Sequence, residues 1–312
     1  MPTTVIAVLL ALASGGAPGE VDRPAVSQGF SLLGKPLFPP PLPEQVEIER
    51  RRQLKEAHLR WEQNPGDVEA AIWVGRRTAY LGLYQDAIEV YDRAIERFPD
   101  DPRLYRHRGH RYITVRKFDL AIADLERAVK LIQGTEDRVE PDGLPNARNQ
   151  PTSTLHGNIW YHLGLAYYLE GDFEQALRCY RECLALATNP DMLCATSHWM
   201  YMTLRRMGRT EQARALLEPI DAALDVIENH AYHELLLMYK GQRDAGELLE
   251  RAAAGDGPEF AATAYGVANW DLYRGHQRRA YERFEALLAD DQWAAFGYIA
   301  AEAELASRRG DR

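Results

Sequence analysis

One pattern recurs along most of this sequence and constrains its fold more strongly than the composition does. Six times an alanine is followed four positions later by a large apolar residue, at Ala87 and Tyr91, Ala121 and Leu125, Ala176 and Tyr180, Ala213 and Leu217, Ala245 and Leu249, and Ala280 and Phe284. Successive alanines lie 34, 55, 37, 32 and 35 residues apart. Helical hairpins of this length cannot bury their apolar faces alone, so the sequence predicts an all-α array of about six stacked hairpins.

The clearest copy of the unit runs from Asn158 to Cys183. Two helices flank a turn at Gly171, and each helix carries large apolar residues and one small residue. The residues that define the unit are Trp160, Leu163, Gly164, Tyr167, Gly171, Phe173, Ala176 and Tyr180. On these residues, which match W-x2-L-G-x2-Y, G and F-x2-A-x3-F, the unit resembles the tetratricopeptide repeat (TPR) family. The resemblance implies a right-handed helical-hairpin solenoid with capping helices, in which the first helix of each hairpin lines a concave groove that binds proteins. The small first-helix residue is kept in three units, at Gly75, Gly109 and Gly164.

Three segments divide the chain. Residues 1–17 hold an apolar core followed by small residues, resemble a secretory signal peptide, and predict export to the periplasm or cell exterior; the alternative is a short apolar cytosolic tail. Residues 18–43 are proline-rich and therefore extended. They are either a spacer or a segment that docks on the solenoid, where they could occupy the groove until a partner displaces them. Residues 44–312 form the solenoid, with helices expected at 44–63 and 293–307 at its two ends.

An insertion interrupts the repeats between the second and third units. The spacing of 55 exceeds 34 by 21 residues, and the surplus lies in residues 134–155, where prolines and glycines exclude helix. Long loops inside compact repeats are more often functional than not. The loop is either a lid over a ligand in the groove or a disordered surface excursion.

Charge and hydropathy exclude two classes of partner. A net charge of -9 argues against bulk nucleic-acid binding, and no run of 18 apolar residues is present that could span a membrane. The three cysteines, Cys179, Cys183 and Cys194, are expected to be buried apolar residues, although a bridge between Cys183 and Cys194 is compatible with the spacing.

The predicted groove is rich in arginine, histidine and aromatic residues although the protein is acidic. The candidate ligand-binding residues are Trp73, Arg76, Arg106, His107, His110, Asn158, Tyr161, His162, His198, Trp199, Arg205, Glu234, Tyr265 and Asn269. Arginine offers a two-pronged donor to carboxylates, and aromatic walls exclude water around it. We therefore expect a non-enzymatic scaffold, without cofactor, that binds a carboxylate-bearing peptide or protein tail and binds it more tightly as histidines become protonated near pH 6.5. The oligomeric state is left open.

A second interpretation uses the histidines differently. His107 and His110 can share a helix face, with His162 and His198 on the next two first helices, which would suit a metal-dependent hydrolase or a small-anion site. The sequence lacks a metal-binding spacing such as H-E-x-x-H and has no acidic residue placed as a general base. The scaffold is therefore the favoured reading.

Overall fold

A computed structural model describes residues 26–254 and 258–310, so the predicted signal peptide lies outside the described residues. Within them the elements are β1 (Gly29–Phe30), β2 (Pro36–Leu37), α1 (Glu44–Gln63), α2 (Val68–Tyr80), α3 (Tyr84–Arg97), α4 (Pro102–Thr114), α5 (Phe118–Ile132), α6 (Leu155–Glu170), α7 (Phe173–Ala185), α8 (Pro190–Arg206), α9 (Thr210–Leu216), α10 (His230–Tyr239), α11 (Ala245–Ala253), α12 (Pro258–Tyr273), α13 (Gln277–Leu287) and α14 (Phe296–Arg309). None of these helices is long and apolar enough to cross a membrane.

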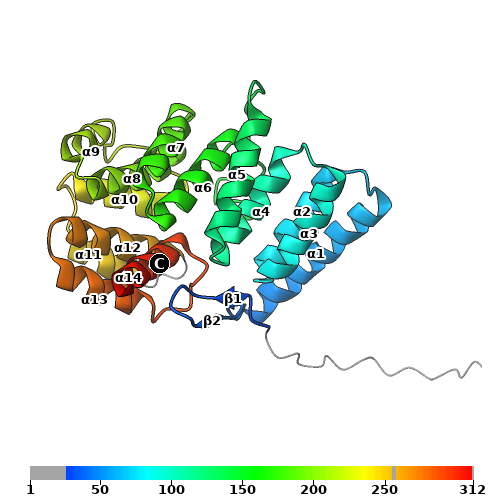
Figure 1. The fold of residues 1–312 in the computed structure, drawn as a ribbon, viewed down its shortest axis with the longest axis horizontal. Helices are drawn as coiled ribbons and strands as arrows, with labels where there is room; N and C mark the ends of the chain where they lie inside the picture. The colour runs from blue at the N-terminus through cyan, green and yellow to red at the C-terminus, as the bar shows by residue number, and fades with distance from the viewer. Residues whose placement is uncertain (1–25, 255–257, 311–312) are drawn as a thin grey trace, which may run out of the picture.

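The helices form a right-handed solenoid of six hairpins, as the sequence predicts (Figure 1). The hairpins are α2–α3, α4–α5, α6–α7, α8–α9, α10–α11 and α12–α13, preceded by α1 and followed by α14. Every phased alanine lies on the second helix of its hairpin. Five of them are fully buried, whereas Ala245 begins α11 and is half-buried.

The first-helix glycine and the large second-helix residue recur together because the two helices of a hairpin approach each other closely. A Cβ on Gly164 would lie 2.8 Å from the Tyr180 ring, and one on Gly75 would lie 2.4 Å from the Tyr91 ring. The aromatic ring of the second helix thus fills the space that the missing side chain leaves on the first. This packing holds α6 to α7 and α2 to α3.

The solenoid curls until its last helix meets its early hairpins. Helix α14 packs on α12 and α13 and also touches α6. The guanidinium of Arg116, in the α4–α5 turn, pairs with Glu302 of α14 at 2.8 Å, and both side chains are almost fully buried. Arg116 also donates to the backbone oxygen of Trp293, at 2.8 Å. Helix α14 therefore closes the array as well as capping its last hairpin.

The proline-rich segment docks beside this closure. Its short hairpin, β1 and β2, lies between α1–α3 and the chain leading into α14 (Figure 1). Leu37 is buried, and the indole Nε1 of Trp293 donates to the backbone oxygen of Phe38 at 2.6 Å. Gln28 accepts two hydrogen bonds from Gln85 at the start of α3, one from its backbone N–H and one from its side-chain amide. The described part of the segment, residues 26–43, thus binds the turn end of the hairpins and does not occupy the concave groove.

Candidate functional site

The inserted loop is an ordered strap across the first helices of the hairpins. It connects Ile132 to Leu155, and Val139 and Thr154 form an antiparallel bridge within it. The guanidinium of Arg76 donates to the backbone oxygen of Pro141 at 2.8 Å, and that of Arg77 donates to Gly143 at 3.0 Å. The loop is thereby fixed to α2.

The far part of the loop is fixed to the connection before α10. Arg148 pairs with Asp225 at 2.6 Å, and the Asn146 amide donates to Glu228 Oε2 at 3.1 Å. Asp191, buried at the start of α8, accepts backbone hydrogen bonds from residues 227–229 and so fixes the segment that carries Glu228. The strap therefore reaches from α2 to α10.

Glu140 of the strap occupies a carboxylate site made by three predicted groove residues. Arg106 Nε lies 3.1 Å from Glu140 Oε2, and His107 Nε2 donates to Glu140 Oε1 at 3.1 Å. The Asn158 amide completes the set, donating to Oε2 at 2.6 Å. Burial opposes ionisation of this carboxyl, but Arg106 and His107 outweigh it and hold the pKa of Glu140 well below its usual value. Three of the predicted groove residues are therefore engaged by a carboxylate of the chain itself.

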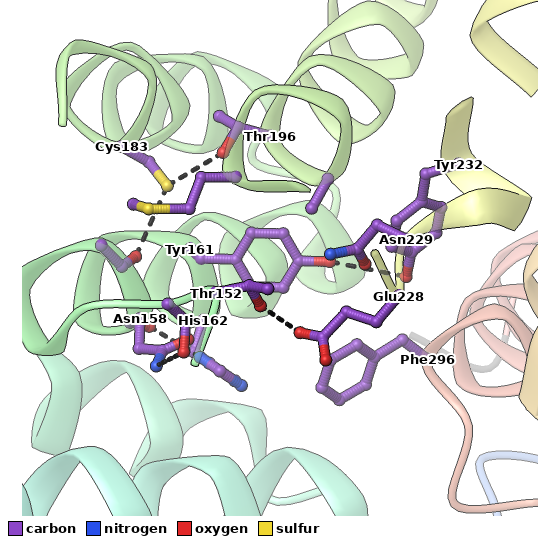
Figure 2. A pocket seen from close by; sticks show the side chains of 14 residues that line it. Thr152, Asn158, Tyr161, His162, Cys183, Thr196, Glu228, Asn229, Tyr232 and Phe296 are labelled. Atoms are coloured by element: carbon purple, nitrogen blue, oxygen red, sulfur yellow. Dashed lines mark hydrogen bonds between the residues drawn. The ribbon is translucent and has the colours of Figure 1, made fainter. Parts of the chain in front are cut away.

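A cavity of about 260 Å³ lies on the α6 side of the strap (Figure 2). Its walls come from the strap, α6, α7, α8, the start of α10 and α14, through residues Thr152, Ser153, Gly157, Asn158, Tyr161, His162, Cys183, Met192, Ala195, Thr196, Glu228, Asn229, Tyr232 and Phe296. We call it the concave cavity. Its aromatic side chains, Tyr161, Tyr232 and Phe296, are only half-buried and so remain available to a ligand.

Hydrogen bonds fix the polar groups around the concave cavity. Thr152 donates its hydroxyl to Glu228, and Tyr161 donates to the Tyr232 oxygen at 3.5 Å. His162 Nδ1 donates to the backbone oxygen of Asn158 at 2.6 Å, and burial lowers the pKa of His162 to about 3. The imidazole is therefore neutral at physiological pH, and Glu228 supplies the charge.

A smaller hollow of about 180 Å³ lies on the other side of the strap, and we call it the loop hollow. It is lined by Glu69, Ile72, Arg76, Arg103, His107, Arg138, Val139, Glu140, Pro141 and Leu155. Arg103 is paired with Glu69 at 2.6 Å and with Asp101 at 2.5 Å. Among the described residues no ion pair joins Arg76 or Arg138 to a carboxylate; the Arg76 guanidinium donates to the backbone oxygen of Pro141 and lies over the Trp73 ring.

The structure gathers part of the predicted groove around the strap. Arg106, His107, Asn158, Tyr161 and His162 lie together there, with the His110 ring 4.5 Å from that of His162. Trp73 packs under the Arg76 guanidinium at 4.4 Å and so belongs to the α2 side of the same region.

Other predicted residues belong to the interior, because the curled solenoid covers their side chains. The buried ones are His198, Trp199, Tyr265 and Asn269, each at most 1% exposed. Trp199 stacks on Tyr265, and the Asn269 amide donates to the Tyr168 hydroxyl at 2.8 Å. In this closed form these four cannot touch a ligand. The prediction that these four residues lie on first helices is correct. The prediction that their side chains line an open groove is wrong.

Two further predicted residues face elsewhere. Glu234 is neutralised by Arg243 and Arg251, at 3.0 and 2.8 Å. Arg205 lies with Arg214 and Lys240 in a separate cavity of about 610 Å³ between α8, α9 and α10. Arg205 therefore does not join Arg106 at one site.

The cavity residues that sequence reasoning missed are Thr152, Glu228, Tyr232 and Phe296. Thr152 and Glu228 sit in connections without helical period, where no pattern indicates direction. Phe296 reaches the cavity because α14 folds back, which the repeat spacing does not reveal. Tyr232 is out of phase with the third unit: counted back from the phased alanines, Tyr161 corresponds to His230, so the repeat pattern does not indicate Tyr232.

The alternative reading as a metal site has no geometric support. Among the described residues, no group of three His, Cys, Asp or Glu side chains lies where it could hold a metal ion. The described cysteines are free thiols, buried in the helical packing, so Cys183 and Cys194 do not form a bridge. The histidines expected to bind metal instead pack against rings, as His198 does on Tyr232 at 4.7 Å.

Comparison with protein families identifies the unit. A model described as "Tetratricopeptide repeat" matches residues 157–189, which include α6 and α7. Residues 157–189 are therefore a tetratricopeptide repeat, as their motif indicates, and the other hairpins repeat its architecture. Proteins of this class are generally interaction scaffolds. No curated protein matches the sequence.

Solved structures of similar shape include other helical-repeat proteins. YrrB, described as a TPR protein with an unusual peptide-binding site, is 16% identical with a TM-score of 0.42 over 76% of this chain and 95% of its own. MamA is 16% identical with a TM-score of 0.41, over 64% of this chain and 92% of its own. A complex of Naa15 and Naa10 bound to HypK-THB is 16% identical with a TM-score of 0.36, over 78% of this chain and 36% of that one. Such distant likeness carries no argument about a ligand.

Proposed function

We propose that this chain is a non-enzymatic scaffold that binds a peptide segment or protein tail across the strap on its concave side. The observation that carries the proposal is the pair of hollows, the concave cavity and the loop hollow, that flank one ordered strap. Both offer hydrogen-bonding groups beside aromatic or aliphatic walls, which is the composition expected of a recognition surface. The position lies on first helices, where the repeat architecture presents its inner face.

The carboxylate preference of the ligand is proposed for the loop hollow. Arg103 and Arg106 are already neutralised by Glu69 and Glu140, so they add little attraction. Arg76 and Arg138 have no such ion pair among the described residues and border the same hollow. A partner carboxylate placed between these two guanidiniums would form charge-assisted hydrogen bonds.

Peptides selected from a random display library against the full chain test the proposal. We expect Arg76→Ala with Arg138→Ala to weaken binding of the selected peptides about fivefold to tenfold, because partly exposed charged hydrogen bonds contribute roughly 1 kcal/mol. Binding should also weaken as salt rises from about 0.1 to 1 M, where the Debye length falls from about 10 to 3 Å. Calorimetric titration of each variant measures both effects.

Arg148→Ala is the matched control, because Arg148 lies in the same strap but pairs with Asp225 outside both hollows. Its affinity should equal that of the parent chain. Failure to select any peptide, or equal loss in the control and the double variant, would count against a binding surface at the strap. Export of the chain stays a separate prediction, tested by sequencing the N-terminus of the mature protein.

A further inference from the structure

The concave cavity has a charge opposite to that of the loop hollow. Among the described residues that line it, Glu228 is the one acidic side chain, no lysine or arginine is present, and His162 is neutral. Burial raises the pKa of the Asp142 carboxyl, which lies in the adjoining strap. The nearby Glu228 raises it further. One Asp142 oxygen is buried without a hydrogen-bond partner. The local field therefore favours a cation.

Three rings surround the same space. The centroids of Tyr161 and Phe296 are 6.5 Å apart with the planes tilted by 44°, and the Tyr232 oxygen lies 3.5 Å from the Tyr161 oxygen. They come from α6, α14 and α10, so they approach the space from different sides (Figure 2). Aromatic faces carry negative charge density and attract ammonium and guanidinium groups within about 6 Å.

The carboxylate of this cavity is held in place. Thr152 donates to one Glu228 oxygen and Asn146 to the other, at 3.1 Å for Asn146. Both donors are neutral, so they orient the carboxylate and leave its charge uncompensated. A volume of about 260 Å³ suits one inserted side chain better than a whole cofactor.

We propose that the concave cavity receives a cationic side chain, lysine or arginine, from the bound segment, with Glu228 as its counter-ion and Tyr161, Tyr232 and Phe296 around its alkyl stem and charged head. This inference rests on the proposed scaffold function and deepens it. The segment would present an acidic group to Arg76 and Arg138 on one side of the strap and a basic group to Glu228 on the other. Two hollows of opposite charge would fix its direction as well as its position.

The cavity can be probed alone with Nα-acetyl-lysine N-methylamide, and with the glutamate analogue for comparison, by chemical-shift titration of the full chain. We expect the lysine probe to shift resonances of residues around Tyr161 and Phe296, and the glutamate probe to leave them unchanged. Glu228→Gln should weaken the lysine probe and the selected peptides about tenfold. Phe296→Leu should weaken both by removing one ring while keeping an apolar side chain.

Asp225→Asn is the control, since it removes a neighbouring acidic charge that lies outside the cavity. Circular dichroism checks that each variant stays folded. Selected peptides that bind without an enriched Lys or Arg, or that bind Glu228→Gln as well as the parent, would refute the cationic anchor and leave the scaffold standing. A lysine probe that binds through Glu228 while no peptide is selected would refute the scaffold and keep the cation site.

Discussion

Three buried histidines on the first helices stay uncharged. Burial is the main cause that lowers the pKa of His107, His162 and His198 to about 3, with the charge of Arg106 adding to the effect at the first two. They therefore remain neutral near pH 6.5, and the expectation that they strengthen carboxylate binding by protonation in that range is wrong. A residue type indicates which protonation chemistry is available, whereas its depth in the fold decides whether that chemistry is used.

The pH dependence of stability follows from the same residues. In the unfolded chain histidine titrates near 6.5, so between pH 7 and pH 5 the unfolded state takes up protons that the folded state does not. Each of the three should thus reduce the free energy of unfolding by about 2 kcal/mol over this interval as the pH falls. Urea unfolding at pH 7, 6 and 5 measures the loss, and His198→Phe should remove about a quarter of it, because burial also holds the pKa of His110 well below its usual value. Equal stability at all three values would contradict the neutral, buried state.

Arg106, His107, Asn158 and His162 show what could be predicted at this scale. Their helical spacing places them on first helices near the insertion, and the structure brings them together there. Glu140 could not be foreseen as the carboxylate they surround, because the strap has no periodicity that fixes which side chains face inward. Pattern reasoning thus found the donors of a site but not the acceptor.

At the scale of the elements, helices α14 and α12 approach each other closely at Gly297. A Cβ on Gly297 would lie 2.1 Å from the backbone oxygen of Ala261 on α12, so the helices touch without a side chain between them. The helix predicted at 44–63 matches α1, whereas the helix predicted at 293–307 begins three residues later, at Phe296, and ends at Arg309. Which face α14 buries against α12 and α6 does not follow from the sequence, because nothing in a repeat motif describes the element after the last repeat.

Gly297→Ala should therefore be costly. We expect it to reduce the free energy of unfolding by about 1–3 kcal/mol, since backbone cannot rotate away from the new methyl group as a side chain can. Gly66→Ala is the control, because its Cβ would meet Asn64 Oδ1 at an ordinary 3.5 Å. Chemical denaturation of both variants decides the matter, and similar stabilities would show that α14 can shift without cost.

At the scale of the whole molecule, Arg116 and Glu302 join the second hairpin to the last helix. Their side chains are 2% and 1% exposed. One Glu302 oxygen has no hydrogen-bond partner in the described residues, which makes this pair a weak source of net stability but a costly one to break. Repeat spacing predicts the array, yet it does not predict this contact, since neighbouring hairpins alone determine the spacing.

Breaking one side of the pair should destabilise the closed form more than removing both. We expect Glu302→Gln or Arg116→Met to cost about 3–5 kcal/mol, because each leaves a buried charge unpaired. The double variant Arg116→Met with Glu302→Leu should recover much of that loss. Thermal and urea unfolding of the three variants provide the comparison, and single variants within about 1 kcal/mol of the parent would mean that water reaches the pair.

The hydrogen bond from Trp293 to the backbone oxygen of Phe38 also sets an order of events in the life of the chain. The two residues are 255 positions apart in sequence. A ribosome that releases the chain from its N-terminus onward exposes residues 26–43 long before it releases Trp293. Successive hairpins can stack during synthesis because they contact their neighbours. Closure must wait until Trp293 has emerged, so until then the N-terminal segment lacks this contact and is accessible to whatever handles nascent chains.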